Sequence, residues 1–390
     1  MNAAEKDRAR QAYREHMKDA RAAFAPGRIE FLGNHLDYNG GPVLGLSIDA
    51  GVYALAIPRK EESLRLFSEN FENAPVETTL HDVSFRQGPE SWANYPLGVL
   101  WALQEIGCAP EVGFELILTT DLPLSAGLSS SAAVELATAL ALLQLAGKSL
   151  SKLDLARLCR RAENEFVGLP CGLLDQGVSA HGEPDQLVHL DCRRETFSLL
   201  PLPPRSSWWI FDTGIKHDLV DSKYAERHAE CSAAYEKLKT LSPELLCLSQ
   251  VTIELLEQTE LSDTEEKRVR HVIEETARVK EAKALLGQGG SASQIGHLLF
   301  ASHRSSSKLF ENSCSELDFL VNDLKTRPGV HGARLTGGGF GGAVLVWANE
   351  EFSVKQAQEA NAAYQAAFGT APTCRRFKVG AGAHFRDPLK

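Results

Sequence analysis

The stretch Leu122–Leu140, LPLSAGLSSSAAVELATAL, joins a turn-rich start to an alanine-rich continuation with high helix propensity. Three consecutive serines, residues 129–131, lie where the two parts meet. The preceding segment Val112–Leu118, VGFELIL, predicts a β-strand. A strand, a glycine-containing loop and a helix start present free backbone N–H groups and the positive end of a helix dipole. This order predicts a phosphate-binding loop, although an ordinary loop with a serine N-cap has a similar composition.

Composition limits the classes of partner. The 390 residues are 43% hydrophobic and 24% charged, which is typical of a globular protein, and they suffice for one large domain or two medium ones. The formal net charge of −10 lacks the basic footprint of a nucleic-acid-binding protein. We therefore expect no nucleic-acid partner, and positive charge only at a few local sites.

Nothing in the sequence indicates export or a membrane. Residues 5–23 predict a short, charged amphipathic helix rather than a signal peptide, and no apolar run approaches the length of a membrane span. The eight cysteines are scattered, without a CxxC pair or metal-ligand spacing, which predicts reduced thiols. We expect a cytoplasmic protein without a membrane partner.

Strands and helices alternate irregularly along both halves of the chain. The proline-rich segment Leu200–Arg205, LPLPPR, predicts a boundary that divides the chain into residues 1–203 and 204–390. The second part contains two long helical patterns, Asp221–Leu241 and Asp263–Leu286. We therefore predict an α+β enzyme of two domains with its ligand cleft between them.

Polar residues crowd the segment Pro26–Val43, PGRIEFLGNHLDYNGGPV. Arg28, Asn34, His35 and Asp37 offer many donors and acceptors, which suits a polyhydroxylated ligand such as a sugar. The Asn-Gly-Gly sequence at the end of this loop is also good turn chemistry, so a solvated turn is the alternative. For His35 alone, a structural role is at least as expected as a ligand contact.

Two further segments contain glycine, one just before a candidate catalytic aspartate and the other in a predicted tight turn. The segment Glu163–Ser179, ENEFVGLPCGLLDQGVS, follows a predicted amphipathic helix over Lys152–Phe166 and places Asp175 just after a glycine-containing loop. From the residues alone, a helix-capping role explains Asp175 as well as a catalytic role does. The segment Ala333–Gly342, ARLTGGGFGG, permits tight turns, and the strand-like residues after it argue against a flexible linker.

Together these segments resemble the GHMP kinases, and among them the galactokinases. The serine loop is similar to the motif P-x-[GSA]-x-G-L-[GS]-S-S-A, and it is not a Walker P-loop because no Gly-Lys-Ser/Thr follows. The segment TGGGFGG matches the third GHMP motif, and ENEFVGLPCGLLDQ resembles E-x-x-F-x-G-x-P-C-G-x-M-D-Q. The segment GRIEFLGNHLDYNGG resembles the signature G-R-x-N-L-x-G-E-H-x-D-Y-N-x-G, from which it departs at Glu30 and Asn34. Weaker similarities occur at Trp92–Gly98 and around Tyr224.

The resemblance implies a fold and two substrates. It implies an N-terminal lobe like ribosomal protein S5 domain 2 and a ferredoxin-like C-terminal lobe, with ATP and a monosaccharide meeting between them. Mg²⁺ would be held by Ser131 and Glu163, whose oxygens suit this hard cation. We expect a monomer or a weak homo-oligomer. The implied ATP-binding residues are Ser125, Ala126, Gly127, Leu128, Ser129, Ser130, Ser131, Gly338 and Gly339.

The resemblance also implies a reaction, phosphoryl transfer to the C1 hydroxyl of the sugar. Asp175 would take the proton from that hydroxyl, and Arg28 would stabilise the transferring phosphoryl group. Galactose is the expected sugar. A neutral Asn34 in place of the family's glutamate would reduce repulsion of a C6 carboxylate, so galacturonate is one alternative and a non-catalytic sugar sensor is another. The implied sugar-binding residues are Asn34, His35, Asp37, Gly172 and Tyr224.

Overall fold

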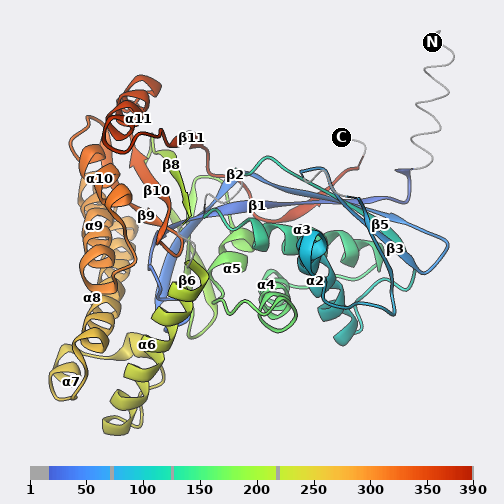
Figure 1. Cartoon of the computed structure of the whole chain (residues 1–390), viewed down its shortest axis with the longest axis horizontal. Helices are drawn as coiled ribbons and strands as arrows, with labels where there is room; N and C mark the ends of the chain where they lie inside the picture. The colour runs from blue at the N-terminus through green and yellow to red at the C-terminus, as the bar shows by residue number, and fades with distance from the viewer. Residues whose placement is uncertain (1–16, 71–73, 124–126, 217–219, 389–390) are drawn as a thin grey trace.

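A computed structural model describes residues 17–70, 74–123, 127–216 and 220–388, and Figure 1 shows an elongated molecule with two differently built ends. Most of the helix predicted over residues 5–23 lies outside the described residues, and Arg21 already belongs to the first strand. One end combines a large sheet with several helices, and the other combines a small sheet with a layer of long helices. The predicted α+β class is therefore confirmed.

The larger sheet contains eight strands, in the order β12-β1-β2-β5-β3-β4, with β6 and β7 added beside the beginning of β2. Every pairing is antiparallel except that of β3 with β5. The last strand, β12, pairs with β1, so the end of the chain returns to the sheet that its beginning forms. The strands are β1 (Arg21–Leu32), β2 (Pro42–Pro58), β3 (Ser63–Ser68), β4 (Val76–Thr79), β5 (Phe114–Thr120), β6 (Gln186–Asp191), β7 (Thr196–Pro201) and β12 (His384–Arg386).

Helices cover one face of this sheet (Figure 1). Helix α3 packs against β1 and β2, and its buried alanines let the helix backbone approach the strands closely. The predicted strand before the serine loop and the predicted helix after it are both confirmed, as β5 and α3. The elements are the 3₁₀ turn η1 (Gly88–Ala93), α2 (Asn94–Glu105), α3 (Ser130–Leu145), α4 (Lys152–Arg161), the π-helical turn η2 (Ala162–Val167) and α5 (Leu174–His181).

The helix predicted over Lys152–Phe166 has a different second half. It is α-helical only to Arg161, and the following turn is π-helical. A π turn rotates the side chains that follow it relative to a regular helix, and such turns are frequent at functional sites. Here the π turn contains Glu163, which is 6% exposed.

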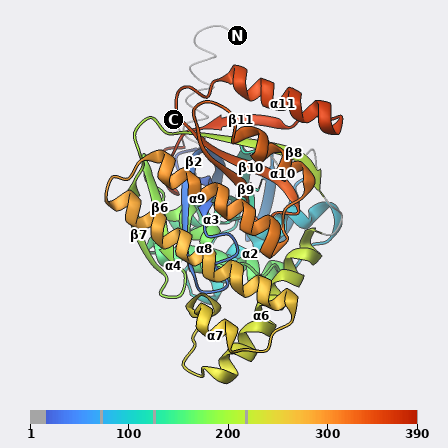
Figure 2. The same ribbon diagram turned by 90° about the vertical axis from the view of Figure 1, so that its left-hand side faces the viewer.

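The smaller sheet has the order β11-β8-β10-β9 and is antiparallel throughout. Figure 2 shows α8 and α9 running side by side across this end of the molecule. The strands are β8 (Ser207–Lys216), β9 (Val330–Thr336), β10 (Gly341–Ala348) and β11 (Thr373–Phe377). The helical elements are α6 (Val220–Leu241), η3 (Leu248–Gln250), α7 (Ile253–Glu257), α8 (Asp263–Gly287), α9 (Ala292–Ser305), the π turn η4 (Ser306–Phe310), α10 (Ser315–Leu324) and α11 (Val354–Phe368).

An aromatic cluster joins the two sheets. Phe31 on β1 makes edge contacts with Trp208 and Trp347, with ring centroids 5.8 and 5.5 Å apart. The two tryptophans stack on each other, and all three side chains are at most 2% exposed. Aromatic side chains of this size contribute large buried areas, so this contact fixes the end of β1, and the loop after it, against the second sheet.

Two further properties concern membrane-spanning helices and the state of the cysteines. In the described residues, no helix combines the length and the apolar composition that a membrane span requires. All eight cysteines are free thiols, as the sequence predicts.

Candidate active site

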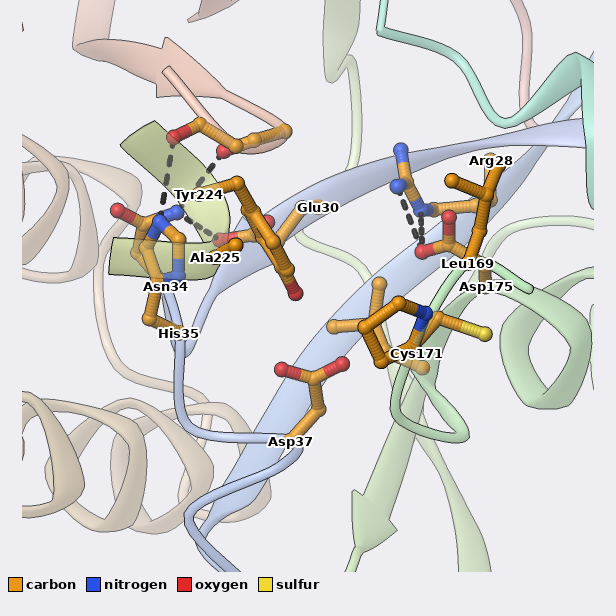
Figure 3. A pocket seen from close by; sticks show the side chains of 14 residues that line it. Arg28, Glu30, Asn34, His35, Asp37, Leu169, Cys171, Asp175, Tyr224 and Ala225 are labelled. Atoms are coloured by element: carbon orange, nitrogen blue, oxygen red, sulfur yellow. Dashed lines mark hydrogen bonds and ion pairs between the residues drawn. The ribbon is translucent and has the colours of Figure 1, made fainter. Parts of the chain in front are cut away.

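A cavity of about 250 Å³ opens where the two halves of the molecule meet (Figure 3). Its walls come from β1, the loop after β1, the loop before α5, the first turns of α6 and the glycine-rich loop after β9. The three segments that the sequence singled out separately therefore share one cavity. The predicted residues that line it are Arg28, Asn34, His35, Asp37, Asp175, Tyr224 and Gly338.

One end of the cavity is organised around Asp175. The Arg28 guanidinium donates to Asp175 Oδ1, with Nε at 2.8 Å and Nη2 at 2.6 Å. Ser129 Oγ donates to Asp175 Oδ2 at 2.5 Å. Arg28 Nη1 also donates to the carbonyl oxygen of Gly127 at 2.8 Å. One carboxylate, one guanidinium and the serine loop thus form a single hydrogen-bonded cluster, which we call the transfer end.

The backbone explains how this cluster forms. The pairing register of β1 with β2 shifts between Pro26 and Arg28, and the Arg28 N–H donates to the carbonyl of Leu128 instead of to a strand. Ser129 adopts a left-handed conformation, φ 55°, which few non-glycine residues do. Its hydroxyl therefore reaches Asp175 and does not cap α3. The first backbone N–H groups of α3 remain available to an anion.

His35 links the loop after β1 to the glycine-rich loop. Its Nε2 lies 3.1 Å from the carbonyl oxygen of Gly338, and its Nδ1 lies 3.0 Å from the Tyr38 hydroxyl. Because a carbonyl only accepts, Nε2 carries the proton and Nδ1 accepts from Tyr38. Burial lowers the pKa of His35 to about 3, so the ring is neutral at physiological pH. Both ring nitrogens are used by the protein itself.

Asp37 projects into the cavity from the loop after β1 (Figure 3). Burial raises its pKa to about 7, and the negative charges of Asp175 and Glu30 act in the same direction. Gly172 makes room for this carboxylate, because a Cβ at Gly172 would lie 2.2 Å from Asp37 Oδ2. Tyr224 on α6 contributes its ring to the opposite wall, where a Cβ at Gly338 would lie 3.3 Å from that ring.

Asn34 is 1% exposed, and its amide is fully hydrogen-bonded. Nδ2 donates to Glu30 Oε1 at 3.1 Å and to the carbonyl of Gly337 at 3.0 Å. Oδ1 accepts from Ser306 Oγ at 3.1 Å and from Asn312 Nδ2 at 2.9 Å. An amide has two donors and two acceptor positions, so none remains for a ligand. The carboxyl group that position 34 lacks is instead present at this end in Glu30, which also lines the cavity.

Helix α8 holds this loop from behind. Glu275 Oε1 accepts from the N–H groups of Gly33 and Asn34 at 2.9 and 3.2 Å, and Oε2 accepts from Arg278 at 2.7 Å. Although burial opposes it, nearby positive charge, led by Arg278, lowers the pKa of Glu275 to about 2. His271 Nε2 lies 3.1 Å from the Asn34 carbonyl, and burial lowers its pKa to about 4. Sequence reasoning missed these residues, because their helix lies far along the chain.

The predicted metal ligands lie close together beside the transfer end. Burial, followed by the charge of Asp175, raises the pKa of Glu163, while a hydrogen bond from Ser131 acts in the opposite direction. Glu163 Oε2 also accepts from Gln176 Nε2 at 2.6 Å and from the neutral Cys171 thiol at 3.2 Å. Adjacent hydroxyl and carboxylate oxygens, in a place where negative charge is poorly compensated, fit a hard divalent cation that also binds phosphate oxygens and water.

A second cavity of about 150 Å³ adjoins the serine loop. Ser130 and Ser131 form one side of it, and Trp92 and Tyr95 line it together with apolar residues of β2, β5 and α3. Its size and apolar walls suit a flat aromatic base. In the sequence, only the weaker family similarity at Trp92–Gly98 points to this cavity, and that similarity alone assigns no role to these residues. Ser125 and Ala126 lie outside the described residues.

Three protein-family models match the chain. Residues 10–58 match the galactokinase galactose-binding signature, residues 94–183 match the GHMP kinases N-terminal domain, and residues 277–367 match the GHMP kinases C-terminal domain. The first match contains Arg28 to Asp37, and the second contains the serine loop, Glu163 and Asp175. All three models therefore cover segments that meet at the cavity.

Characterised relatives and solved structures agree. Galactokinase from Enterococcus faecalis is 38% identical over 83% of this chain and 84% of its own. Galactokinase from Thermotoga maritima is 37% identical over 88% of this chain and 94% of its own. The crystal structure of Lactococcus lactis galactokinase complexed with galactose superposes with a TM-score of 0.90, at 31% identity, over 97% of this chain and 99% of its own. A mevalonate kinase, 17% identical with a TM-score of 0.65, shares the fold. The chain belongs to the galactokinase family of GHMP kinases.

Proposed function

We propose that this protein transfers the γ-phosphoryl group of ATP to the C1 hydroxyl of galactose. The observation that carries the proposal is the cluster of Asp175, Arg28 and Ser129, where the sugar signature and the phosphate-binding loop meet. A carboxylate suited to accept a hydroxyl proton thus lies next to the groups suited to hold the transferred phosphate. Galactose follows from the galactose-binding signature and from the relatives, which are galactokinases.

At the transfer end, Asp175 receives the proton from the C1 hydroxyl as that oxygen attacks the γ-phosphorus. The bond between the γ-phosphorus and the β,γ-bridging oxygen breaks, and ADP leaves with its electron pair. Arg28 keeps the carboxylate oriented, and it stabilises negative charge on the transferring group. Phosphoryl transfer depends mainly on in-line positioning and charge neutralisation, which these fixed contacts provide. Ser129 fixes the second carboxylate oxygen, so that the proton acceptor has one orientation before the substrates bind.

The phosphates would lie along the serine loop. The N–H groups of residues 129–131 and of Ser125 to Leu128 are the proposed donors, and Gly338 and Gly339 would close the site from the glycine-rich loop. Gly127 and Gly337 already face each other, because a Cβ at Gly337 would lie 3.5 Å from the Gly127 carbonyl oxygen. The second cavity, beside Trp92 and Tyr95, would take the adenine ring.

We further propose that Ser131 and Glu163 hold Mg²⁺. The ion, when bound, neutralises charge on the β- and γ-phosphates. Cys171 and Gln176 hold the Glu163 carboxylate in place by donating to Oε2. This arrangement gives Glu163 one orientation before the ion binds.

For the sugar, we propose contacts with Asp37, Tyr224 and the loop that contains Asn34 and His35. Gly172 acts by leaving space for Asp37. Since this chain supplies every proposed site residue, a monomer is sufficient for activity. Eight free thiols support a cytoplasmic protein.

The test is ATP-dependent ADP release with a panel of sugars: galactose, glucose, galacturonate and a no-sugar control. The proposal expects galactose to give by far the highest kcat/KM. Galactose binding without ADP release would identify a sensor, and a preference for galacturonate would identify a different sugar kinase. Either outcome would contradict the proposal.

A further inference from the structure

Glu30 is a carboxylate on the cavity wall that the proposed reaction does not yet use. It lies near the end of β1, on the side of the cavity away from Arg28 and Asp175, beside Asn34 and His35 (Figure 3). We call this side the remote end. Its side chain is 7% exposed, so it faces a confined space and not open solvent.

Only one oxygen of Glu30 is occupied by the protein. Oε1 accepts from Asn34 Nδ2 at 3.1 Å and from Arg334 Nη1 at 3.0 Å. Within the described part of the chain, no hydrogen bond to Oε2 is formed, and Oε2 is not among the fully buried polar atoms. The carboxylate is therefore held by one oxygen and presents the other to the cavity.

Glu30 forms an ion pair with a buried partner. Arg334 on β9 is fully buried, and its ion pair is with Glu30. Two of its nitrogens, Nε and Nη2, have no hydrogen-bond partner in the described structure. A buried guanidinium needs a counter-charge, and the Glu30 carboxylate lies where it supplies one. Arg334 does not line the cavity, so a ligand meets the carboxylate and not the guanidinium.

Asn34, four residues later, cannot accept a hydrogen bond from a ligand without losing a protein contact, because all four hydrogen-bonding positions of its amide are occupied. The amide instead orients Glu30. With C1 of the sugar at Asp175, the hydroxyls that approach the remote end are those at the opposite side of the ring, at C4 and C6. An ionised carboxylate accepts a hydrogen bond from a hydroxyl and repels a second carboxylate.

We propose that Glu30 Oε2 accepts a hydrogen bond from a hydroxyl at the end of the sugar remote from C1. Glu30 thereby selects a sugar with a hydroxyl there and rejects a uronic acid. This inference rests on the proposed function, because it uses Asp175 to orient the sugar. It assigns sugar selection to Glu30, and to Asn34 only the orientation of Glu30.

The experiment combines one substitution with changes in the sugar. Glu30→Gln keeps an oxygen for Arg334 and Asn34, and replaces Oε2 with an amide nitrogen. For wild type and variant, kcat/KM and the dissociation constant are measured with galactose, 6-deoxygalactose, glucose (the C4 epimer) and galacturonate. A hydrogen bond to a charged group corresponds to roughly a ten- to hundredfold effect, so we expect that loss with galactose.

The decisive question is whether the effect of the sugar change on kcat/KM and on the dissociation constant differs between wild type and variant. We expect the penalty for 6-deoxygalactose or for glucose to shrink at least fivefold in Glu30→Gln, and discrimination against galacturonate to fall. Unchanged penalties for both sugars would overturn the proposal. Ser302→Ala is the matched control, because it removes a buried hydrogen bond to Glu275, behind the same loop, without touching Glu30, the Asn34 amide or the cavity. The same shrinkage in this control would also overturn the proposal.

Two additions keep the result interpretable. If Glu30→Gln does not fold, Glu30→Asp keeps the counter-charge of Arg334 but withdraws the oxygens by one methylene, and the same difference between wild type and variant is expected. The dissociation constants separate this inference from the proposed function. If wild type binds galactose without turnover, the proposed function fails, and the test of Glu30 is still decided by binding.

Discussion

The two ends of the cavity differ in how far their polar groups are exposed. At the transfer end, the Asp175 side chain is 29% exposed, and the N–H groups at the start of α3 have no acceptor within the helix. At the remote end, Asn34 and His35 are at most 4% exposed, and their polar atoms are bonded to the protein. The proposed reacting groups are thus accessible at one end, whereas the other end is an extension of the core with one free carboxylate oxygen.

This difference separates the effects that substitutions should have. Changes at the transfer end should reduce turnover in a protein that still folds, because few contacts of the core depend on those groups. Changes at the remote end should alter stability or sugar affinity more than the rate of the chemical step. The following predictions test this separation, from the largest expected effect to the smallest.

Asp175→Asn should have the largest effect. The two side chains are nearly isosteric, so the fold should persist, while the proton acceptor is lost. General-base catalysis is typically worth about 10²–10⁴-fold, and kcat should fall on that scale. The measurement is steady-state kinetics beside a thermal melt. A folded variant with turnover within a few-fold of wild type would remove Asp175 from the mechanism.

Arg28→Lys keeps a positive charge but loses the planar fork that contacts both Asp175 and the Gly127 carbonyl. We expect kcat to fall by about 10²–10³-fold, with the KM for ATP nearly unchanged, because the lost interaction is strongest in the transition state. Should only the KM for ATP change, Arg28 would be a binding residue, and the transfer end would need a different description.

Glu275→Gln tests the opposite end. The pKa of Glu275, lowered from 4.5 to about 2, corresponds to roughly 3 kcal/mol of stability above pH 4.5. Because the folded pKa is the lower one, this contribution is lost as the pH falls from about 4.5 to about 2. We expect the variant to unfold more easily at pH 7, by an amount that shrinks over that acid range, as denaturant titrations would show. An equal difference at every pH would contradict this explanation.

Glu163→Gln should raise the Mg²⁺ concentration needed for half-maximal activity, and a chelator should abolish activity in wild type. Groups that merely orient a metal ligand are worth roughly 10- to 100-fold in metal affinity, so loss of a direct carboxylate ligand should cost at least as much. Titration of activity with Mg²⁺ measures this. An unchanged metal requirement would place the ligand elsewhere.

Asp37 should make sugar affinity depend on pH. With a pKa of about 7, its carboxylate is mostly protonated at pH 6 and mostly ionised at pH 8. If the ionised form accepts from the sugar, galactose should bind about tenfold more tightly at pH 8 than at pH 6. Calorimetry with wild type and Asp37→Asn would show it, since the variant should bind equally at both values. A pH dependence that persists in the variant would exclude Asp37 as its source.

Local patterns in the sequence determined much of the fold and the transfer end. The order of strand, serine loop and alanine-rich helix predicted β5, the loop and α3, because these elements depend on propensity and on neighbours in sequence. The positions of Arg28 and Asp175 followed from the family motifs. Their mutual contact is a long-range property that no local pattern contains. The division at residues 203 and 204 stays a prediction, although β12 returns to the first sheet.

The remote end could not be predicted in the same way. The sequence shows that Glu30 and Asn34 depart from the family signature, but not that the two side chains bond to each other or that Arg334 lies behind them. The sequence alone therefore predicts residue 34 as the position that lacks its carboxylate. The π turn at Glu163 was missed for a related reason, since it continues a regular amphipathic pattern. In both cases tertiary contacts determined the outcome.

The most direct test of the account is the identity of the product. Wild-type protein is incubated with ATP, Mg²⁺ and galactose labelled with carbon-13 at C1, and the product is examined by phosphorus-31 NMR. The account predicts a sugar phosphate whose phosphorus couples to the labelled carbon, formed in step with ADP. A phosphate on any other carbon, or galactose that binds without being phosphorylated, would contradict the placement of C1 at Asp175.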